Sequence, residues 1–360
     1  MIETDALIVG AGPIGLFQVF QLGLLEINCH VIDALPHPGG QCAQLYPDKP
    51  IYDIPGLPAT TGRALAAALR QQIEPFVASG SAQLHWGQLV SSVRKLSDGR
   101  FAVTTSAGLN FTTKVLIIAA GAGAFVPRKL MVPGLEAFEG SQVFYAQPEF
   151  DAFAGKHVVV QGDDDTALGW ALRCVNLTAT PPQSVTLIHR REVFTASAEL
   201  VNAMRALCAA GKMRFVAGQI TAPEVSTTNC ITDSPATLGT LTALQLALPD
   251  GSSETLPADV LLASLGLSPK LGPLAEWGLE MQRKQLPVDT ETFQTAQPGI
   301  FAVGDINTYP GKKKLIVCGF HECVLAAFAA ADIVFPGKPQ PLQYTTTSTR
   351  LHGLLGVAGV

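Results

Sequence analysis

Charged residues are scarce in this sequence. Only 15% of the 360 residues are Asp, Glu, Lys or Arg, whereas soluble chains average about 25%. The 29 acidic and 24 basic residues give a net charge of −5 without a basic segment, which argues against nucleic-acid binding. At 48% hydrophobic residues, the chain is also too apolar to be disordered. Its length predicts two domains.

A long hydrophobic run is also missing. A membrane span needs about 20 mainly apolar residues, and the best candidate, Val324 to Phe335, is shorter and contains Asp332. The first residues include Glu3 and Asp5 and lack the basic start of a signal peptide. We therefore expect a cytoplasmic protein whose hydrophobic residues lie in a core, in an interface or against a cofactor, with no membrane contact.

The seven cysteines include no C-x-x-C pair. Their odd number and scattered positions are typical of neither a disulfide framework nor a metal site. We expect reduced and mostly buried thiols. Cys318 and Cys323 are the only close pair. The four residues between them, at the start of a helix predicted over Cys323–Val334, argue against a redox role.

A glycine motif follows the first predicted strand, Ala6–Val9, and precedes a predicted helix over Leu16–Leu25. It fits G-x-G-x-x-G with Gly10, Gly12 and Gly15. Such glycines permit a tight turn, the approach of a diphosphate and close helix–strand packing, and the helix N-terminus attracts phosphate. Asp33 follows the next strand, Cys29–Ile32, where a carboxylate can accept from a ribose hydroxyl. The pattern predicts a dinucleotide site.

Two further segments favour FAD over NAD(P) at this site. Gly39-Gly40-Gln41 follows the second strand within a loop rich in Gly and Pro, and Gly299–Asp305 comes much later in the chain. Asp305 can accept a hydrogen bond from a ribityl hydroxyl. A ligand confined to one β-α-β unit does not need a distant segment, whereas the longer FAD does.

A second β-α-β pattern begins near residue 156, with strands at Val158–Val160 and Val185–Ile188 and a helix over Thr166–Val175. Two such units in one chain predict an α/β fold with two Rossmann-like dinucleotide-binding domains. We assign residues 1–121 plus 285–360 to a discontinuous FAD-binding domain and residues 122–284 to an NADP-binding domain.

Further motifs extend along nearly the whole chain. They are Gly10–Phe17, Gly39–Gln41, Leu45–Lys49, Ile51–Gly56, Ala119–Gly121, Ala124–Leu130, Ile188–Arg191, Trp277–Leu279 and Ala302–Asp305. In these motifs the sequence resembles the thioredoxin-reductase-like ferredoxin–NADP reductases, a family of two-domain flavoproteins. The resemblance implies a homodimeric oxidoreductase that transfers electrons between NADPH and ferredoxin or flavodoxin through FAD.

The resemblance also implies which residues contact FAD. In this family one aromatic ring stacks on the flavin, and Tyr46 has that position. A C-terminal extension, usually from the partner subunit, covers the other flavin face. Tyr344 is its candidate aromatic, the alternative being a surface residue in a loose tail, and Thr345 and Thr346 are possible neighbours of flavin N5. Because the flavin performs the chemistry, no catalytic acid, base or nucleophile is expected. The implied contacts are Asp33, Gln41, Tyr46, Val90, Phe125, Asp305 and Thr346.

The second site is expected to bind NADPH. His189, Arg190 and Arg191 follow a strand, at the position that meets the adenosine ribose. Arginines there suit the 2′-phosphate of NADP rather than the 2′-hydroxyl of NAD. The alternative is a solvated basic cluster on the surface.

The glycine turn of the second site departs from the family pattern Gly-Gly-Gly-Asp-Ser-Ala. Gly162 and Ala167 match the pattern, but Asp163 and Asp164 replace glycines, and Thr195 replaces a basic residue. We assign Gly162 and Thr166 to the NADP site. Carboxylates repel a diphosphate, so we predict weakened or absent NADPH binding. The alternative is that these side chains point away and NADPH binds normally. A second functional hypothesis follows: an FAD-binding electron carrier or sensor with a degenerate NADPH site.

A ferredoxin is usually acidic and needs a basic docking surface. Lys312, Lys313 and Lys314, together with Arg128 and Lys129, are the candidates for it. The alternative is a solvated turn. Electrostatic docking predicts a rate that falls as salt is added.

Overall fold

The chain forms two compact units. The computed structural model describes residues 1–146, 149–179, 181–226 and 239–357, and at Phe125 the backbone alone. The first unit contains residues 1–124 and 269–360, and the second contains residues 125–268. The chain returns to the first unit at Pro269 rather than at residue 285, because Leu274 of the 3-10 helix η3 (Gly272–Glu276) is buried in a hydrophobic cluster of the first unit.

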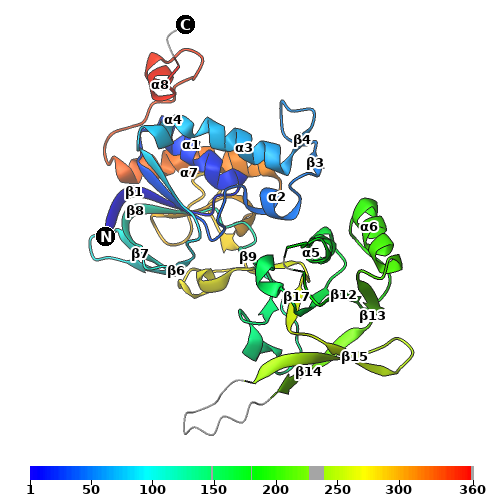
Figure 1. The fold of residues 1–360 in the computed structure, drawn as a ribbon. Coiled ribbons are helices and arrows are strands. Elements are labelled where there is room, and N and C mark those ends of the chain that lie inside the picture. The colour runs from blue at the N-terminus through cyan, green and yellow to red at the C-terminus, as the bar shows by residue number, and fades with distance from the viewer. Residues whose placement is uncertain (147–148, 180, 227–238, 358–360) are drawn as a thin grey trace. The chain divides into compact units, whose positions relative to one another are not determined.

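A seven-stranded sheet is the centre of the first unit (Figure 1). Its strands are β1 (Ile2–Val9), β2 (Cys29–Ile32), β5 (Ala82–His85), β6 (Val90–Lys95), β7 (Phe101–Thr105), β8 (Asn110–Ile118) and β20 (Ile300–Ala302). β1 pairs in parallel with β2 on one side and with β8 on the other. The chain therefore adds β2 and β5 on one side of β1 and β8 on the other, so the strand order changes direction between β1 and β8. Open α/β sheets bind ligands at such a point.

Both faces of this sheet are buried. Three helices cover one face in Figure 1: α1 (Pro13–Leu24), α3 (Gly62–Gln72) and α7 (Ile316–Val334). Successive residues of a strand point to opposite faces. Ala6 and Ile8 of β1 accordingly join the cluster under the helices, while Leu7 joins the cluster formed by β6, β7 and η3. This explains the uninterrupted apolar run in β1.

Helix α7 belongs to the core of the first unit. It is longer than the helix predicted from the sequence, and of the helices in the described part of the chain it alone has the length and composition of a membrane span. However, Ala326, Ala327, Ala330 and Ala331 are fully buried in the cluster that also contains α1 residues. Glu322 of the same helix is fully buried as well. These contacts are those of a core helix.

The loop rich in Gly and Pro contains a helix that the sequence did not predict. This helix, α2 (Gly40–Leu45), begins after Gly39, whose φ of 113° favours glycine. The remaining elements of the first unit are short: β3 (Pro50–Ile51), β4 (Thr60–Thr61), α4 (Glu74–Ala78), β19 (Leu286–Pro287), η4 (Gly304–Ile306), β21 (Asn307–Thr308) and α8 (Thr349–Leu354).

A five-stranded parallel sheet in the order β10-β17-β11-β12-β13 is the centre of the second unit. Its strands are β10 (Val143–Phe144), β11 (His157–Gln161), β12 (Ser184–His189), β13 (Arg214–Ala217) and β17 (Val260–Ala263). The other elements are η1 (Leu135–Phe138), η2 (Phe150–Phe153), α5 (Asp165–Val175), α6 (Ala198–Ala209), β14 (Gln219–Ser226), β15 (Thr240–Ala247) and β16 (Ser253–Pro257). Two short strands, β9 (Ala124–Pro127) and β18 (Leu267–Lys270), each include a boundary between the units. The predicted α/β fold with two Rossmann-like units is confirmed.

Candidate dinucleotide sites

The first glycine turn lies where β1 and β8 end. A Cβ atom at Gly10 would come within 2.4 Å of the Ala119 carbonyl oxygen, and one at Gly15 within 1.8 Å of the Gly10 oxygen. These two glycines therefore permit close packing of β1, β8 and α1. Gly12 differs, because its Cβ would meet only Gly40 Cα, at 3.8 Å. No side chain caps α1 at Gly12 and its first turn is free of acidic residues, so this helix end is open to a phosphate.

Asp33 fixes the end of β2 against this turn. Its Oδ2 accepts from the Ala11 amide at 2.5 Å and its Oδ1 from the Leu35 amide at 2.8 Å. Burial raises the pKa of the Asp33 carboxyl, while the two amides oppose that shift. The Gly39 amide also donates to the Ala11 carbonyl, at 2.9 Å. The turn, the end of β2 and the start of α2 are therefore held together by the Asp33 carboxylate and by one backbone hydrogen bond.

The distant Gly304-Asp305 segment returns to the same place. A Cβ at Gly304 would lie 3.2 Å from the Ile14 side chain, in the first turn of α1. The charge of Asp305 raises the pKa of both Cys42 and Tyr46, although burial is the larger cause in each. Asp305 therefore lies near α2 as well as near α1, which is the convergence that the sequence predicts for FAD.

A buried ion pair forms hydrogen bonds with both the backbone amide and the backbone carbonyl of Gly304. The Gly304 amide donates to Glu322 Oε2 at 2.7 Å, and Lys312 Nζ donates to the Gly304 carbonyl at 2.9 Å. Lys312 and Glu322 pair with each other, with side chains 6% and 0% exposed. Asn307 and Tyr309 also donate to Glu322, at 2.8 and 2.9 Å. Sequence reasoning missed this network, although a lone Glu in an apolar helix was its signal.

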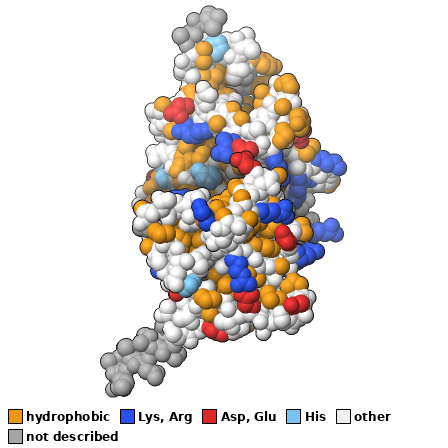
Figure 2. All heavy atoms as spheres, turned by 45° about the vertical axis from the view of Figure 1, so that its right-hand side comes forward, with side chains coloured by type: hydrophobic (Ala, Val, Ile, Leu, Met, Phe, Trp, Pro, Cys, Tyr) orange, Lys and Arg blue, Asp and Glu red, His pale blue; other side chains and the backbone are white. Residues whose placement is uncertain are grey.

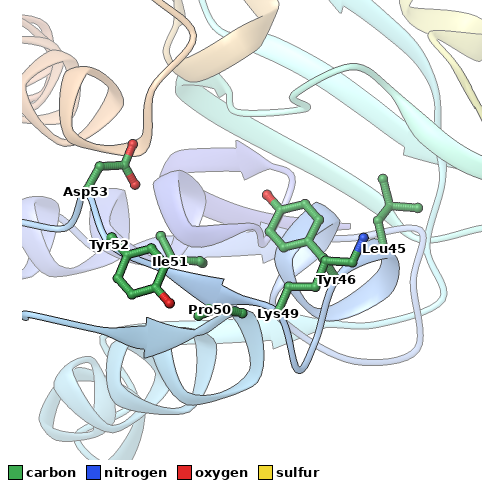
Figure 3. A pocket seen from close by; sticks show the side chains of 7 residues that line it. All are labelled: Leu45, Tyr46, Lys49, Pro50, Ile51, Tyr52 and Asp53. Carbon is green, nitrogen blue, oxygen red and sulfur yellow. The ribbon is translucent and has the colours of Figure 1, made fainter. Parts of the chain in front are cut away.

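Tyr46 lines a pocket with a volume of about 620 Å³. Figure 3 shows the Tyr46 and Tyr52 rings separated along the segment, with Pro50 and Ile51 between them. The Tyr46 hydroxyl lies 3.4 Å from Cys42 Sγ, and partial burial raises its pKa. Tyr52 is 71% exposed. The pocket residues come from one continuous segment: Leu45, Tyr46, Lys49, Pro50, Ile51, Tyr52 and Asp53.

The other residues expected to contact FAD in this chain are placed as follows. Gln41 lies on α2, with its amide nitrogen 3.2 Å from where a Cβ at Gly121 would be. Val90 is buried at the start of β6 in the same cluster as Ile32. The side chain of Phe125 lies outside the described residues. Because the Gly12 position is open and acceptors converge on it, the residues present fit an FAD diphosphate and its hydroxyls.

The second glycine turn has the same position in its own sheet, after β11 and beside the end of β17. The Gly162 amide donates to the Ile188 carbonyl at 3.1 Å, and a Cβ at Gly162 would clash with the Ser264 oxygen at 2.4 Å. His189 ends the neighbouring strand β12, where its Nδ1 contacts the Arg191 carbonyl at 2.8 Å. Arg190 and Arg191 are exposed. Four of the predicted residues therefore lie at one edge of the sheet, namely Gly162, His189, Arg190 and Arg191. Thr166 lies in the first turn of α5, close in sequence to Gly162.

Asp164 makes the second turn chemically different from the first. It is the N-cap residue of α5, and its Oδ1 accepts from the Ala167 amide at 2.8 Å. The Ser264 hydroxyl donates to the same carboxylate at 3.0 Å. Asp165 also turns inward, accepting from the Ser197 amide at 2.7 Å. The Asp164 carboxylate therefore lies at the N-terminus of α5, and weakened NADPH binding stays a prediction.

Comparison with known proteins agrees with this architecture. Residues 63–304 match the family model of the pyridine nucleotide-disulphide oxidoreductases. The chain is 55% identical to a ferredoxin–NADP reductase of Polaromonas sp. over 99% of this chain and 93% of the relative. It is 56% identical to one of Albidiferax ferrireducens, over 99% and 96%. The chain belongs to the ferredoxin–NADP reductase family. The resemblance found in the sequence is thereby confirmed.

Solved structures show the same fold at lower identity. Lactococcus lactis thioredoxin reductase superposes with a TM-score of 0.53 at 22% identity, over 92% of this chain and 99% of that one. Bacillithiol disulfide reductase from Staphylococcus aureus gives 0.55 at 18%, over 91% and 98%. In this ferredoxin–NADP reductase family member, Cys323 of the close pair Cys318 and Cys323 is fully buried, and burial raises the pKa of its thiol well above the usual value.

The C-terminal residues predicted to contact the flavin lie apart from the first glycine turn of the same chain. Tyr344 and Thr346 precede α8, and Arg350 of α8 pairs with Glu26, beyond the C-terminal end of α1. The glycine turn is at the other end of that helix, whose 12 residues span about 18 Å. A partner subunit would have to bring Tyr344, Thr345 and Thr346 to a flavin, and this stays a prediction.

The predicted docking surface needs one correction. Lys312 is not an exposed docking residue, because it is buried in the ion pair with Glu322. Lys129 pairs with Glu139. Lys313 and Lys314 are exposed at the residues just before α7, and Arg128 is exposed in the second unit.

Proposed function

We propose that this chain is an FAD-dependent reductase that transfers electrons between NADPH and ferredoxin or flavodoxin. The observation that carries the proposal is the open end of α1 at Gly12, with Asp33 and Asp305 gathered around it. Relatives named ferredoxin–NADP reductase, more than half identical over nearly the full chain, support the reaction. We further propose a cytoplasmic homodimer in which Tyr344, Thr345 and Thr346 of the partner subunit reach the flavin.

The residues of the first site bind and orient rather than react. When bound, FAD supplies hydride acceptance from NADPH and the release of single electrons. The α1 N-terminus at Gly12 would hold the diphosphate, Asp33 and Asp305 would accept from hydroxyls, and Tyr46 would pack on the ring. In the second unit, Arg190 and Arg191 would hold the 2′-phosphate of NADPH by charge-assisted hydrogen bonds.

Replacing Gly12 by Asp tests the FAD assignment. The Gly12 position has room for a Cβ, and an Asp there would cap α1 as Asp164 caps α5. We therefore expect Gly12→Asp to fold but to be purified with less than a tenth of the wild-type FAD content, because the carboxylate takes the place of the phosphate. FAD absorbance per chain and circular dichroism provide the two measurements. A folded Gly12→Asp protein with full FAD content would contradict this site.

The reaction itself is tested with the purified wild-type protein. NADPH is added anaerobically, and reduction of added ferredoxin or flavodoxin is followed by absorbance. We expect both partners to be reduced only when NADPH is present. The proposal fails if the FAD-loaded protein reduces neither partner at any NADPH concentration. Dynamic light scattering of the same sample tests the homodimer.

A further inference from the structure

The two glycine turns of this chain are built alike, and their N-cap residues invite direct comparison. Gly12 and Asp164 both follow the first glycine by two residues and both cap the helix after the first strand. At Gly12 no side chain caps the helix, and its first turn contains no acidic residue. At Asp164 a carboxylate lies on the helix end, bonded to the Ala167 amide at 2.8 Å. One turn is open to an anion, whereas the other holds an anion of its own.

The Asp164 carboxylate is also held from the opposite side. Ser264 follows β17, and its hydroxyl donates to both Asp164 oxygens at 3.0 Å. β11 and β17 are parallel neighbours, and between them the order in which the chain adds strands to the second sheet changes direction. The carboxylate therefore occupies the place where open α/β sheets bind nucleotides, and it uses an amide that a diphosphate would otherwise use.

We propose that Asp164 is an affinity-setting residue that acts as an internal phosphate mimic in the nucleotide unit. A dinucleotide diphosphate then binds only when the carboxylate leaves the Ala167 amide and the Ser264 hydroxyl. The exposed Arg190 and Arg191 remain available to the other end of the nucleotide. This inference rests on the proposed function, because it assumes that NADPH is the ligand of the second unit. It predicts weak nucleotide binding with an intact fold.

The decisive experiment measures NADP⁺ binding to the FAD-loaded protein by calorimetry. We expect Asp164→Gly to bind at least tenfold more tightly than wild type, because the competing carboxylate is gone. Asp164→Asn keeps an oxygen acceptor for the Ala167 amide but loses the charge, so its affinity should lie between the two. Asn is also a good N-cap residue, which guards against a variant that simply fails to fold.

Asp165→Asn is the matched control. It removes one negative charge from the same turn, but the Asp165 carboxylate binds the Ser197 amide rather than the N-cap position. We expect its NADP⁺ affinity to change less than threefold. If Asp165→Asn tightens binding as much as Asp164→Asn, the effect is general electrostatics and the proposal is overturned.

The remaining outcomes separate this inference from the proposed function. If wild type binds NADP⁺ as tightly as Asp164→Gly, Asp164 does not set the affinity, yet NADPH stands as the substrate. If neither protein binds NADP⁺ at millimolar concentration, both the inference and the NADPH assignment are overturned. Tightening confined to the Asp164 variants supports both.

Discussion

A pair of histidines lies on neighbouring strands of the first sheet. His30 Nδ1 on β2 is 2.9 Å from His85 Nε2 on β5, and the Phe111 ring packs edge-on against both. Burial, followed by the nearby His85, lowers the pKa of His30 to about 4. Burial also lowers the pKa of His85. Because each shift disfavours the charged ring, the pair is neutral in the folded protein at neutral pH.

This pair predicts a loss of stability in mild acid. Above pH 6.5 His30 is neutral in both states. Below pH 6.5, His30 takes up a proton in the unfolded chain, whereas in the folded chain it does so only near pH 4. The free energy of unfolding therefore falls as pH falls. From about pH 7.5 to about pH 5.5 the loss from one such group is about 1 kcal/mol. Urea unfolding at the two pH values, with excess FAD, measures it.

The control for this prediction is His30→Gln, which does not titrate but can still hydrogen-bond His85. Its loss of stability between the two pH values should be smaller by about the same 1 kcal/mol. Equal losses in both proteins would show that His30 is not responsible.

At the scale of single residues, the sequence predicted positions better than contacts. The glycines at 10, 12, 15 and 162 mark turns, because spacing and flanking strands are local properties. Lys312 was predicted to be exposed in a basic run, yet its partner Glu322 lies ten residues away on α7. Which of three adjacent lysines turns inward depends on that helix, and nothing in the run itself distinguishes them.

At the scale of elements, the ion pair between Lys312 and Glu322 connects η4 with α7. Glu322 lies on α7, and both partners bond to Gly304 of η4. Glu322 accepts from the Gly304 amide, and Lys312 donates to the Gly304 carbonyl. The turn that contains Asp305 is therefore held by side chains from outside it, namely Glu322 of α7, Lys312 and Gln285. Removing one partner of a buried ion pair leaves an uncompensated charge and costs about 3–5 kcal/mol.

Lys312→Met is therefore expected to lower the free energy of unfolding by about 3 kcal/mol and to release FAD at a lower temperature. The double variant Lys312→Met/Glu322→Gln should recover part of that loss, since it removes the orphaned charge. Flavin fluorescence during heating reports the release. The exposed pair of Arg63 and Asp48 serves for comparison, because Arg63→Ala should cost less than about 1 kcal/mol. Equal losses in Lys312→Met and Arg63→Ala would contradict the role given to the buried pair.

The sequence predicted helices and strands correctly where a local pattern determines their bounds, and it failed where tertiary contacts determine them. β2 was predicted with its observed bounds, Cys29–Ile32, because a short apolar run between turns is typical of a buried strand. α7 begins at Ile316 rather than Cys323, since the start of a core helix depends on its neighbours. α2 was missed, because its two starting glycines read as loop and only their positive φ angles begin the helix.

At the scale of the whole molecule, the scarcity of charge leaves few ways to attract a charged partner. The net charge of −5 repels an acidic protein at long range. On the face in Figure 2, Lys and Arg side chains form small scattered groups among hydrophobic and uncharged ones. Steering of a partner toward this chain therefore depends on local groups rather than on the total field.

Lys313 and Lys314 are such a group in the first unit. They directly follow Lys312, whose ammonium group holds the Gly304 carbonyl, so they lie close to the turn that presents Asp305. Arg94 and Lys95 are a comparable exposed pair at the far end of β6. The adjoining hairpin tip reaches Glu3 through Arg100, at the edge of the sheet opposite the glycine turn.

The rate of reaction with an acidic ferredoxin should therefore depend on Lys313 and Lys314 but not on Arg94 and Lys95. We expect Lys313→Ala/Lys314→Ala to lower kcat/KM for ferredoxin about fivefold or more near 0.02 M salt. Near 0.5 M salt the difference should nearly vanish, because the charges are screened within a few ångströms. Arg94→Ala/Lys95→Ala changes the net charge equally and should leave kcat/KM within about twofold of wild type at either salt concentration. Equal effects of the two double variants would mean that total charge, rather than the position beside the Gly304–Asp305 turn, governs the encounter.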